Sequence, residues 1–376
     1  MGKRKAGITR GYSGVGHYIQ GPGAIDMLAS SAAKLGRTCA ILIDVYFYDS
    51  MSKSLRAQFE KDAPEVDVEF FPADLECSEE TIAAFIEKCR ARFPGSGKCP
   101  QVLVGIGGGK AMDPARGAAI TTDSDLIEVP TSASTNAATS CLAVIYDENK
   151  VGRARFLKKS PDYVIADTSI IAAAPARMLA AGIGDALATY YEARSCWADN
   201  NVNYVSGGLA PTITGKVVAK ACRDTLLTNG RDAYLAVKNH VRTAAFEDTI
   251  EAIMLLSGIG WQNNGTAIAH ALVEGVPTIP DTARYMHGEC VAFCVLVQMI
   301  MDRDPKEDFD AVYSFLKDLH LPVCLADIGI TENKTEKVRY IVDRAFEIDP
   351  GITIANYAID RDSVYNAVMY LDALAQ

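Results

Sequence analysis

Histidine is scarce in this chain, and two of its five histidines fall in one short region. His270 lies in GTAIAHALVEG, which has a helical pattern, and His287 opens the next expected helix in YMHGE. Upstream, Asp185 is a lone acid in the apolar run GIGDALA, where an unpaired buried carboxylate would be costly. Imidazole is a common metal ligand, and one Asp with two His leaves a tetrahedral position open, as in catalytic zinc sites. The spacing alone fits equally well two core histidines and an acid at a helix N-terminus.

A run of glycines offers a second kind of chemistry. In VGIGGGKAMDPARG, residues 104–117, an apolar run passes directly into Gly107–Gly109 and then into Lys110 and an expected helix. Glycines let backbone amides approach a pyrophosphate, and a helix N-terminus adds partial positive charge. The spacing matches neither the dinucleotide fingerprint nor a P-loop, so a strand–helix turn without a ligand stays open as an alternative.

An acid closes another apolar run. Asp44 follows the apolar residues 39–43 directly. A carboxylate at the end of such a strand can accept the ribose hydroxyls and repels a 2′-phosphate, which favours NAD over NADP. The alternative is that Asp44 only caps the next helix.

A polar loop follows a further apolar run. Residues 130–140, PTSASTNAATS, carry many hydroxyl groups between two apolar segments. These hydroxyls could bind phosphate, ribose or carboxamide, or they could belong to an ordinary surface loop.

Short apolar runs alternate with helical patterns in the first half of the chain. Strands are expected at 38–44, 65–72, 101–106 and 126–130, and a helix at 78–92. Such alternation is typical of βαβ units, so we expect a mostly parallel sheet. Beyond about Pro175, helices are expected at 176–199, 211–228, 233–257 and 289–301, with Gly182 and Gly184 interrupting the first. The sequence therefore predicts a nucleotide-binding α/β domain over residues 1–173 and a helical domain over residues 174–376.

The overall composition narrows the class of protein. The 37 Lys and Arg against 47 Asp and Glu give a net charge of −10, which disfavours binding to nucleic acid or to an anionic membrane. The longest apolar run, residues 290–301, is shorter than the roughly 20 residues that span a bilayer. No secretory signal follows the basic N-terminus, and the ten cysteines contain no C-x-x-C pair. We therefore expect reduced thiols and a cytoplasmic protein.

Several longer motifs, in this order, resemble one known family. They are HYIQGPG (17–23), the Gly107–Asp113 turn, PTSAST (130–135), residues 161–168, GIGDALATYYEAR (182–194), PDTARYMHGECVAF (280–293) and LPVCLADIGI (321–330). The chain resembles the glycerol dehydrogenase branch of the iron-containing alcohol dehydrogenase superfamily, whose fold is similar to that of dehydroquinate synthases. The resemblance implies a Rossmann-like N-terminal domain, an all-helical C-terminal domain and an active site in the cleft between them.

The resemblance also implies roles for individual residues. Asp185, His270 and His287 would be the metal ligands, and because Thr189 replaces the additional His of the iron-using members, zinc is expected. The NAD contacts would be Asp44, Gly108, Gly109, Lys110, Asp113, Thr131, Ser134, Ser140, Leu142 and Tyr146. The implied activity is hydride transfer between NAD and a small polyol, vicinal diol or hydroxy-carbonyl compound, by a homo-oligomer.

The chain departs from the family pattern near the expected substrate. Asn136 replaces the Asp that helps to hold glycerol, Val273 replaces a His, and Cys290 replaces a Lys. Loss of the carboxylate at position 136 would ease binding of an anionic 2-hydroxy or 2-oxo acid, which is one alternative, beside an aldehyde. A lyase like dehydroquinate synthase is another alternative, although only Arg284 supplies basic charge near the metal motifs. A third is a non-catalytic protein that binds NAD or a metal.

Overall fold

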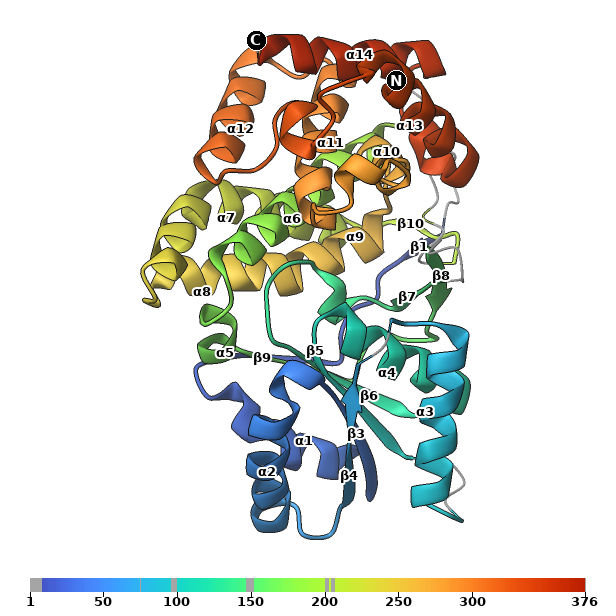
Figure 1. Ribbon diagram of the computed structural model, residues 1–376, viewed down its shortest axis with the longest axis vertical. Helices are drawn as coiled ribbons and strands as arrows, with labels where there is room; N and C mark the ends of the chain where they lie inside the picture. Colours follow the sequence, from blue (N-terminus) through green and yellow to red (C-terminus); the bar gives the residue numbers. More distant parts are fainter. Residues whose placement is uncertain are drawn as a thin grey trace. The chain divides into compact units, whose positions relative to one another are not determined.

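The computed structural model describes residues 9–74, 76–95, 100–146, 152–199, 203 and 207–375. Cys99, one of the cysteines counted above, lies outside these residues. The described chain forms two compact units. Residues 14–132 and 137–174 form an α/β unit, while residues 9–13, 133–136 and 175–375 form a helical unit (Figure 1). We describe each unit by itself.

A six-stranded parallel sheet forms the centre of the α/β unit (Figure 1). Its strands, in spatial order, are β2 (His17–Gly21), β9 (Tyr163–Asp167), β6 (Asp125–Pro130), β5 (Val102–Gly107), β3 (Thr38–Asp44) and β4 (Asp67–Ala73). Every pairing within this sheet is parallel. The parallel sheet expected from the alternation of strands and helices is confirmed, and β3, β4, β5 and β6 lie at the four expected strand positions.

Both faces of the sheet are covered. In β3, Ile41 and Ile43 join one buried cluster, which includes residues of α1 (Leu28–Leu35) and α2 (Val45–Asp62). The intervening Leu42 joins a second cluster with residues of α3 (Glu79–Arg92) and α4 (Gly109–Thr122). Side chains alternate between the two faces of a strand, so a sheet covered on both sides needs apolar residues at nearly every position. That requirement explains the continuous apolar runs in the sequence.

Smaller elements complete the α/β unit. They are η1 (Ala24–Met27), η2 (Ala137–Thr139), α5 (Thr168–Ala172) and the antiparallel hairpin of β7 (Leu142–Tyr146) and β8 (Gly152–Phe156). The polar loop at 130–140 therefore joins the end of β6 to this hairpin.

Helices build almost all of the second unit. The longer ones are α6 (Ala176–Asp199), α7 (Ile213–Lys238), α8 (Ala244–Glu251), α9 (Gly258–Asn264), α10 (Ile268–Val273), α11 (His287–Met301), α12 (Lys306–Asp318), α13 (Lys334–Ile348) and α14 (Arg361–Leu374). A π-helical turn, η3 (Ala252–Ser257), joins α8 to α9, and the short turns are η4 (Val276–Thr278), η5 (Pro280–Thr282), η6 (Ala326–Ile328) and η7 (Pro350–Thr353). The short strands β1 (Arg10–Gly11) and β10 (Ala210–Pro211) pair in parallel. No helix in the described ranges combines the length and apolar character needed to cross a membrane.

Three expectations about the helices are wrong. The continuous helix expected at 233–257 is broken, because α7 ends at Lys238 and α8 begins only at Ala244. The expected gap between residues 228 and 233 does not exist, because α7 continues through Gly230 to Lys238. A Cβ at Gly230 would lie only 2.8 Å from the Phe315 ring, so this glycine is a packing residue inside a helix. Likewise, Gly182 and Gly184 do not interrupt α6, which is continuous from Ala176 to Asp199. They let other backbone segments approach this helix closely.

Candidate functional site

The helices α6 and α11 touch through glycines. A Cβ at Gly184 would lie 2.6 Å from the Gly288 carbonyl oxygen, and a Cβ at Gly288 would lie 2.0 Å from the Ala181 carbonyl oxygen. Only hydrogen fits at these two positions. Asp185 on α6 is thereby held against the first turn of α11, which begins at His287. The glycines of the sequence motif thus bring the ligand-bearing segments together.

Asp185, His270 and His287 form one cluster. One potential ligand atom from each residue lies within 4.8 Å of the other two. The Nε2 atoms of His270 and His287 lie 3.3 Å and 3.7 Å from the same Asp185 Oδ1 atom. Asp185 is buried, whereas the His287 side chain is 44% exposed, so the cluster is open on one side. Two imidazoles and a carboxylate fit a divalent first-row metal, with room for a further ligand on the exposed side.

A fourth residue, Glu192, belongs to this cluster. Its carboxylate is fully buried, and Oε2 lies 2.5 Å from His270 Nδ1. The sequence analysis did not identify Glu192. The signal for it is its spacing, since Glu192 lies seven residues after Asp185. Two helical turns place both acids on one face of α6. A carboxylate on the second nitrogen of a metal-binding histidine is typical of metal sites.

The electrostatics of the cluster favour positive charge. Burial opposes a charge on His270, but the carboxylates of Glu192 and Asp185 outweigh it and raise the His270 pKa well above its usual value. Burial alone would raise the Asp185 pKa, but the hydrogen bond with His270 and the charges of both histidines hold it below its usual value. Two buried carboxylates require a compensating cation, which can be a protonated imidazole or a metal ion.

Asn136 lies beside the cluster. Its backbone amide donates to Asp185 Oδ2 at 3.2 Å, and its side-chain Nδ2 donates to Ser257 Oγ at 2.8 Å. Ser257 Oγ is in turn 2.9 Å from Thr189 Oγ1. The structure therefore brings position 136 to the proposed ligands, where it contributes neutral groups only.

The glycine turn of the α/β unit forms a separate feature. Strand β5 ends at Gly107, whose φ of 148° strongly favours glycine, and Gly108 is the N-cap of α4. A Cβ at Gly107 would lie 2.8 Å from Asp44 Cβ, so the acid and the turn are neighbours. Asp44 also accepts the Tyr46 amide at 3.0 Å and caps α2. The capping role is thus confirmed, while the contact with ribose stays a prediction.

Lys110 projects from the start of α4. Its Nζ lies 2.6 Å from Glu76 Oε1, and this hydrogen bond and the charge of Glu76 raise the Lys110 pKa. Both side chains are more than half exposed, so the pair is only weakly stabilising and Lys110 can turn toward an anionic ligand.

Most of the remaining predicted cofactor residues lie on the polar loop after β6 and on strand β7. The Thr131 amide donates to the Gly107 carbonyl at 3.2 Å, which joins the polar loop to the glycine turn. Ser140 Oγ accepts the Leu142 amide at 3.2 Å, and Tyr146 ends β7 with a partly exposed ring. Ser134 belongs to residues 133–136, which fold with the helical unit.

Arg116 is a buried residue that the sequence reasoning did not identify. Its guanidinium bonds Asp113 Oδ1 at 3.0 Å and the carbonyls of Ala137 and Leu142 at 2.8 Å and 2.6 Å. It therefore ties α4 to the loop and hairpin that follow β6. Burial raises the pKa of Asp113 to about 6, and the charge of Arg116 offsets part of that effect.

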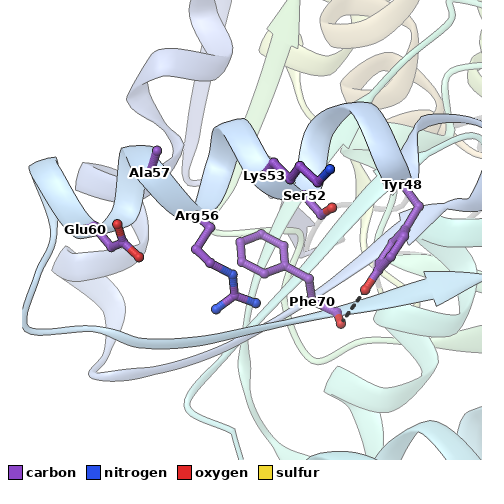
Figure 2. Close-up of a pocket in the computed structure, with 7 residues that line it drawn as sticks. All are labelled: Tyr48, Ser52, Lys53, Arg56, Ala57, Glu60 and Phe70. Carbon is purple, nitrogen blue, oxygen red and sulfur yellow. Dashed lines mark hydrogen bonds between the residues drawn. The ribbon is translucent and has the colours of Figure 1, made fainter.

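A pocket of about 250 Å³ lies elsewhere, on α2 and β4 (Figure 2). Figure 2 shows Arg56 beside the Phe70 ring, at 4.9 Å from its centroid, and Tyr48 donating to the Phe70 carbonyl. Tyr48 and Arg56 are engaged in contacts within the protein, and the pocket contains none of the predicted site residues, so it is not a candidate site.

The chain is similar in sequence and in structure to known alcohol dehydrogenases. Residues 16–168 match the family described as iron-containing alcohol dehydrogenase. The chain is 38% identical over 364 residues to the glycerol dehydrogenase of Escherichia coli O6:H1, covering 96% of each chain. It is similar to the crystal structure of a probable glycerol dehydrogenase from Sinorhizobium meliloti, with a TM-score of 0.89 and 35% identity. The match covers 98% of this chain and 99% of that chain. A less similar relative is hydroxycarboxylate dehydrogenase A of Escherichia coli K12, 31% identical over 256 residues, which are 66% of this chain and 68% of that protein.

Proposed function

This chain belongs to the glycerol dehydrogenase branch of the iron-containing alcohol dehydrogenase family, and from this premise we propose that it transfers hydride between NAD and a small polyol, vicinal diol or hydroxy-carbonyl compound. The observation that carries the proposal is the convergence of Asp185, His270 and His287 on one point. A lyase like dehydroquinate synthase is disfavoured by these relatives, and a non-catalytic protein is disfavoured by the complete ligand set.

Asp185, His270 and His287 would hold a divalent cation, with zinc favoured because Thr189 offers only a hydroxyl where a fourth protein ligand would stand. When bound, such a cation lowers the pKa of a substrate hydroxyl as a Lewis acid. The protein contributes the orientation of the three ligands. The Asn136 amide holds the Asp185 carboxylate, and the exposed side of His287 leaves an approach for the substrate.

The glycine turn would hold the cofactor. The amides at Gly108 and Gly109 open α4 and suit a pyrophosphate, while Asp44, next to Gly107, suits the ribose hydroxyls. The carboxylate would repel a 2′-phosphate, so NAD is favoured over NADP. When bound, NAD would supply the hydride acceptor for this reaction. The other predicted contacts, from Lys110 and Asp113 to Tyr146, belong to the same proposal.

A second candidate function is the interconversion of 2-hydroxy and 2-oxo acids, and Asn136 is the observation that favours it. With Asp185 and Glu192 ionised, a divalent cation would bring the centre to neutrality, whereas an aspartate at position 136 would add a negative charge. Like charges about 5 Å apart at an effective dielectric of about 20 repel by about 3 kcal/mol, which corresponds to on the order of a hundredfold in kcat/KM. The relative named for hydroxycarboxylates supports this candidate.

The experiment that separates the candidates compares the wild-type chain with the Asn136→Asp variant, both loaded with zinc. Rates of NADH formation or consumption are measured with glycerol, 1,2-propanediol, dihydroxyacetone, methylglyoxal, 2-hydroxy acids and 2-oxo acids. A higher wild-type kcat/KM for the polyols supports the first candidate. A higher value for the acids, together with a drop of about a hundredfold in Asn136→Asp, supports the second.

The cytoplasmic location and the homo-oligomeric assembly expected from the sequence also belong to this proposal. Light scattering of the purified protein measures its mass in solution and tests the assembly directly.

A further inference from the structure

Glu192 forms hydrogen bonds with both the backbone and the ring of the segment that carries His270. Its Oε1 atom accepts the backbone amides of Ala267 and His270, at 2.9 Å and 2.8 Å. Its Oε2 atom faces His270 Nδ1 at 2.5 Å. One buried carboxylate on α6 therefore holds both the backbone and the ring of a residue on α10.

The first turn of α10 explains why these contacts matter. Its N-cap residue is Ala267, which has no side chain able to cap, and the first amides of a helix need external acceptors. Glu192 Oε1 accepts two of these amides, and Gln298 Oε1 on α11 accepts the amide of Ala269 at 3.0 Å. The helix that carries His270 is thus tied to α6 and α11 by buried oxygen atoms.

The same contact fixes where the His270 proton lies. A carboxylate only accepts hydrogen bonds, so Nδ1 must carry a proton toward Glu192 Oε2. A neutral imidazole then has its lone pair on Nε2, the atom that lies 3.3 Å from Asp185 Oδ1. We propose that Glu192 is the positioning residue that sets the His270 tautomer and backbone, so that Nε2 is ready to bind the metal. This inference rests on the metal site of the proposed function.

The variant Glu192→Gln tests the tautomer because glutamine has the same shape but only one acceptor oxygen. If that oxygen keeps the two amides, the NH₂ group donates to Nδ1 and drives the proton to Nε2, which then cannot bind metal. If the amide group flips, its NH₂ faces the donors of Ala267 and His270, and buried donors are left unsatisfied. In both orientations we expect metal affinity to fall by about 10- to 100-fold, as is typical when such a partner is lost.

The experiment titrates the full-length protein with Zn²⁺ in competition with a chromogenic chelator. Glu128→Gln is the matched control, since Glu128 is a second fully buried glutamate and lies in the α/β unit. We expect Glu192→Gln to bind zinc 10- to 100-fold more weakly than wild type, and Glu128→Gln to bind it as wild type does. Equal zinc affinity of Glu192→Gln and wild type would overturn the inference alone. No zinc binding by the wild type would overturn the proposed function and this inference with it.

A second measurement needs no variant and so does not depend on the folding of Glu192→Gln. In zinc-loaded wild-type protein labelled with ¹⁵N-histidine, the long-range ¹H–¹⁵N spectrum reports which ring nitrogen carries the proton. We expect a protonated Nδ1 and a metal-bound Nε2 for His270. A His270 ring bound to zinc through Nδ1, or protonated at Nε2, contradicts the role of Glu192.

Discussion

Replacing Gly288 by alanine should open the metal cluster. A Cβ at this position would lie 2.0 Å from the Ala181 carbonyl oxygen and 3.2 Å from Asp185 Cβ. A carbon and an oxygen that are not bonded to each other need about 3 Å or more, in line with ordinary packing distances, so α6 and α11 must separate by roughly 1 Å. Asp185 and His287 lie on these two helices beside the contact, and the distance between their ligand atoms should increase by a similar amount.

Two opposing effects decide how Gly288→Ala changes the free energy of unfolding and the catalytic rate. Alanine is intrinsically the better helix former by about 1 kcal/mol, so helix propensity alone would stabilise Gly288→Ala. Forcing an extra carbon into a packed interface costs about 1–3 kcal/mol, and a 1 Å displacement of catalytic groups can reduce the rate on the order of a hundredfold. We therefore expect a lower free energy of unfolding, weaker zinc binding and a strongly reduced kcat.

The assays are urea unfolding, zinc competition and NADH absorbance. Gly117→Ala is the matched control, because its Cβ would meet the end of the flexible Ile82 side chain in the α/β unit rather than a backbone atom. We expect that control to keep the zinc affinity of the wild type. If Gly288→Ala is at least as stable as wild type and keeps its zinc affinity and rate, the close contact of α6 and α11 is not what holds the site.

Three further predictions follow. Asp113, with an ordinary pKa near 3.8, titrates near 6 in the folded protein, so the unfolded chain loses this proton first as the pH rises. The free energy of unfolding should then fall by about 2 kcal/mol between pH 4 and pH 6, and Asp113→Asn should flatten that fall in urea titrations. An unchanged slope would exclude Asp113 as its source. Asp44→Ala should weaken NAD binding and reduce discrimination against NADP, and loss of the helix cap should lower the free energy of unfolding by about 1 kcal/mol. Fluorescence titration with NADH and NADPH measures the binding, and an unchanged NADH affinity would exclude the contact with ribose. His287→Ala should abolish zinc binding and activity without loss of helical circular dichroism, because its side chain is 44% exposed; full activity would remove His287 from the ligand set.

The parallel sheet could be predicted because strands that are buried on both faces have a recognisable sequence pattern. Strands such as β3 and β5 have apolar residues on both faces, so they appear as unbroken apolar runs. The strands β2 and β9 are not among the expected strands, and their pairing joins segments about 145 residues apart. Glycines inside helices were misread for a related reason. Gly230 and Gly184 look like helix breaks until the Phe315 ring and the α11 backbone beside them are known.

The candidate site was predictable where residue type and rarity carried the signal. Two histidines and a lone acid were compatible with a metal site, and the family resemblance implied Asp185, His270 and His287 as its ligands; the structure brings the three together. Charged side chains in helices are mostly exposed, so nothing in the sequence marks Arg116 as buried, and the one signal for Glu192 is its place on the same helix face as Asp185. Their role depends on groups distant in sequence, the His270 ring for Glu192 and the Leu142 carbonyl for Arg116.

The central claim is that a cation held by Asp185, His270 and His287 supports NAD-dependent oxidation of an alcohol. The most direct measurement is the rate of NADH formation on the substrate panel by chelator-treated protein, followed during titration with Zn²⁺. The account predicts a negligible rate in the metal-free protein and full recovery as one zinc ion binds per chain. Full activity without metal, or no NADH from any substrate of the panel at saturating zinc, would contradict it.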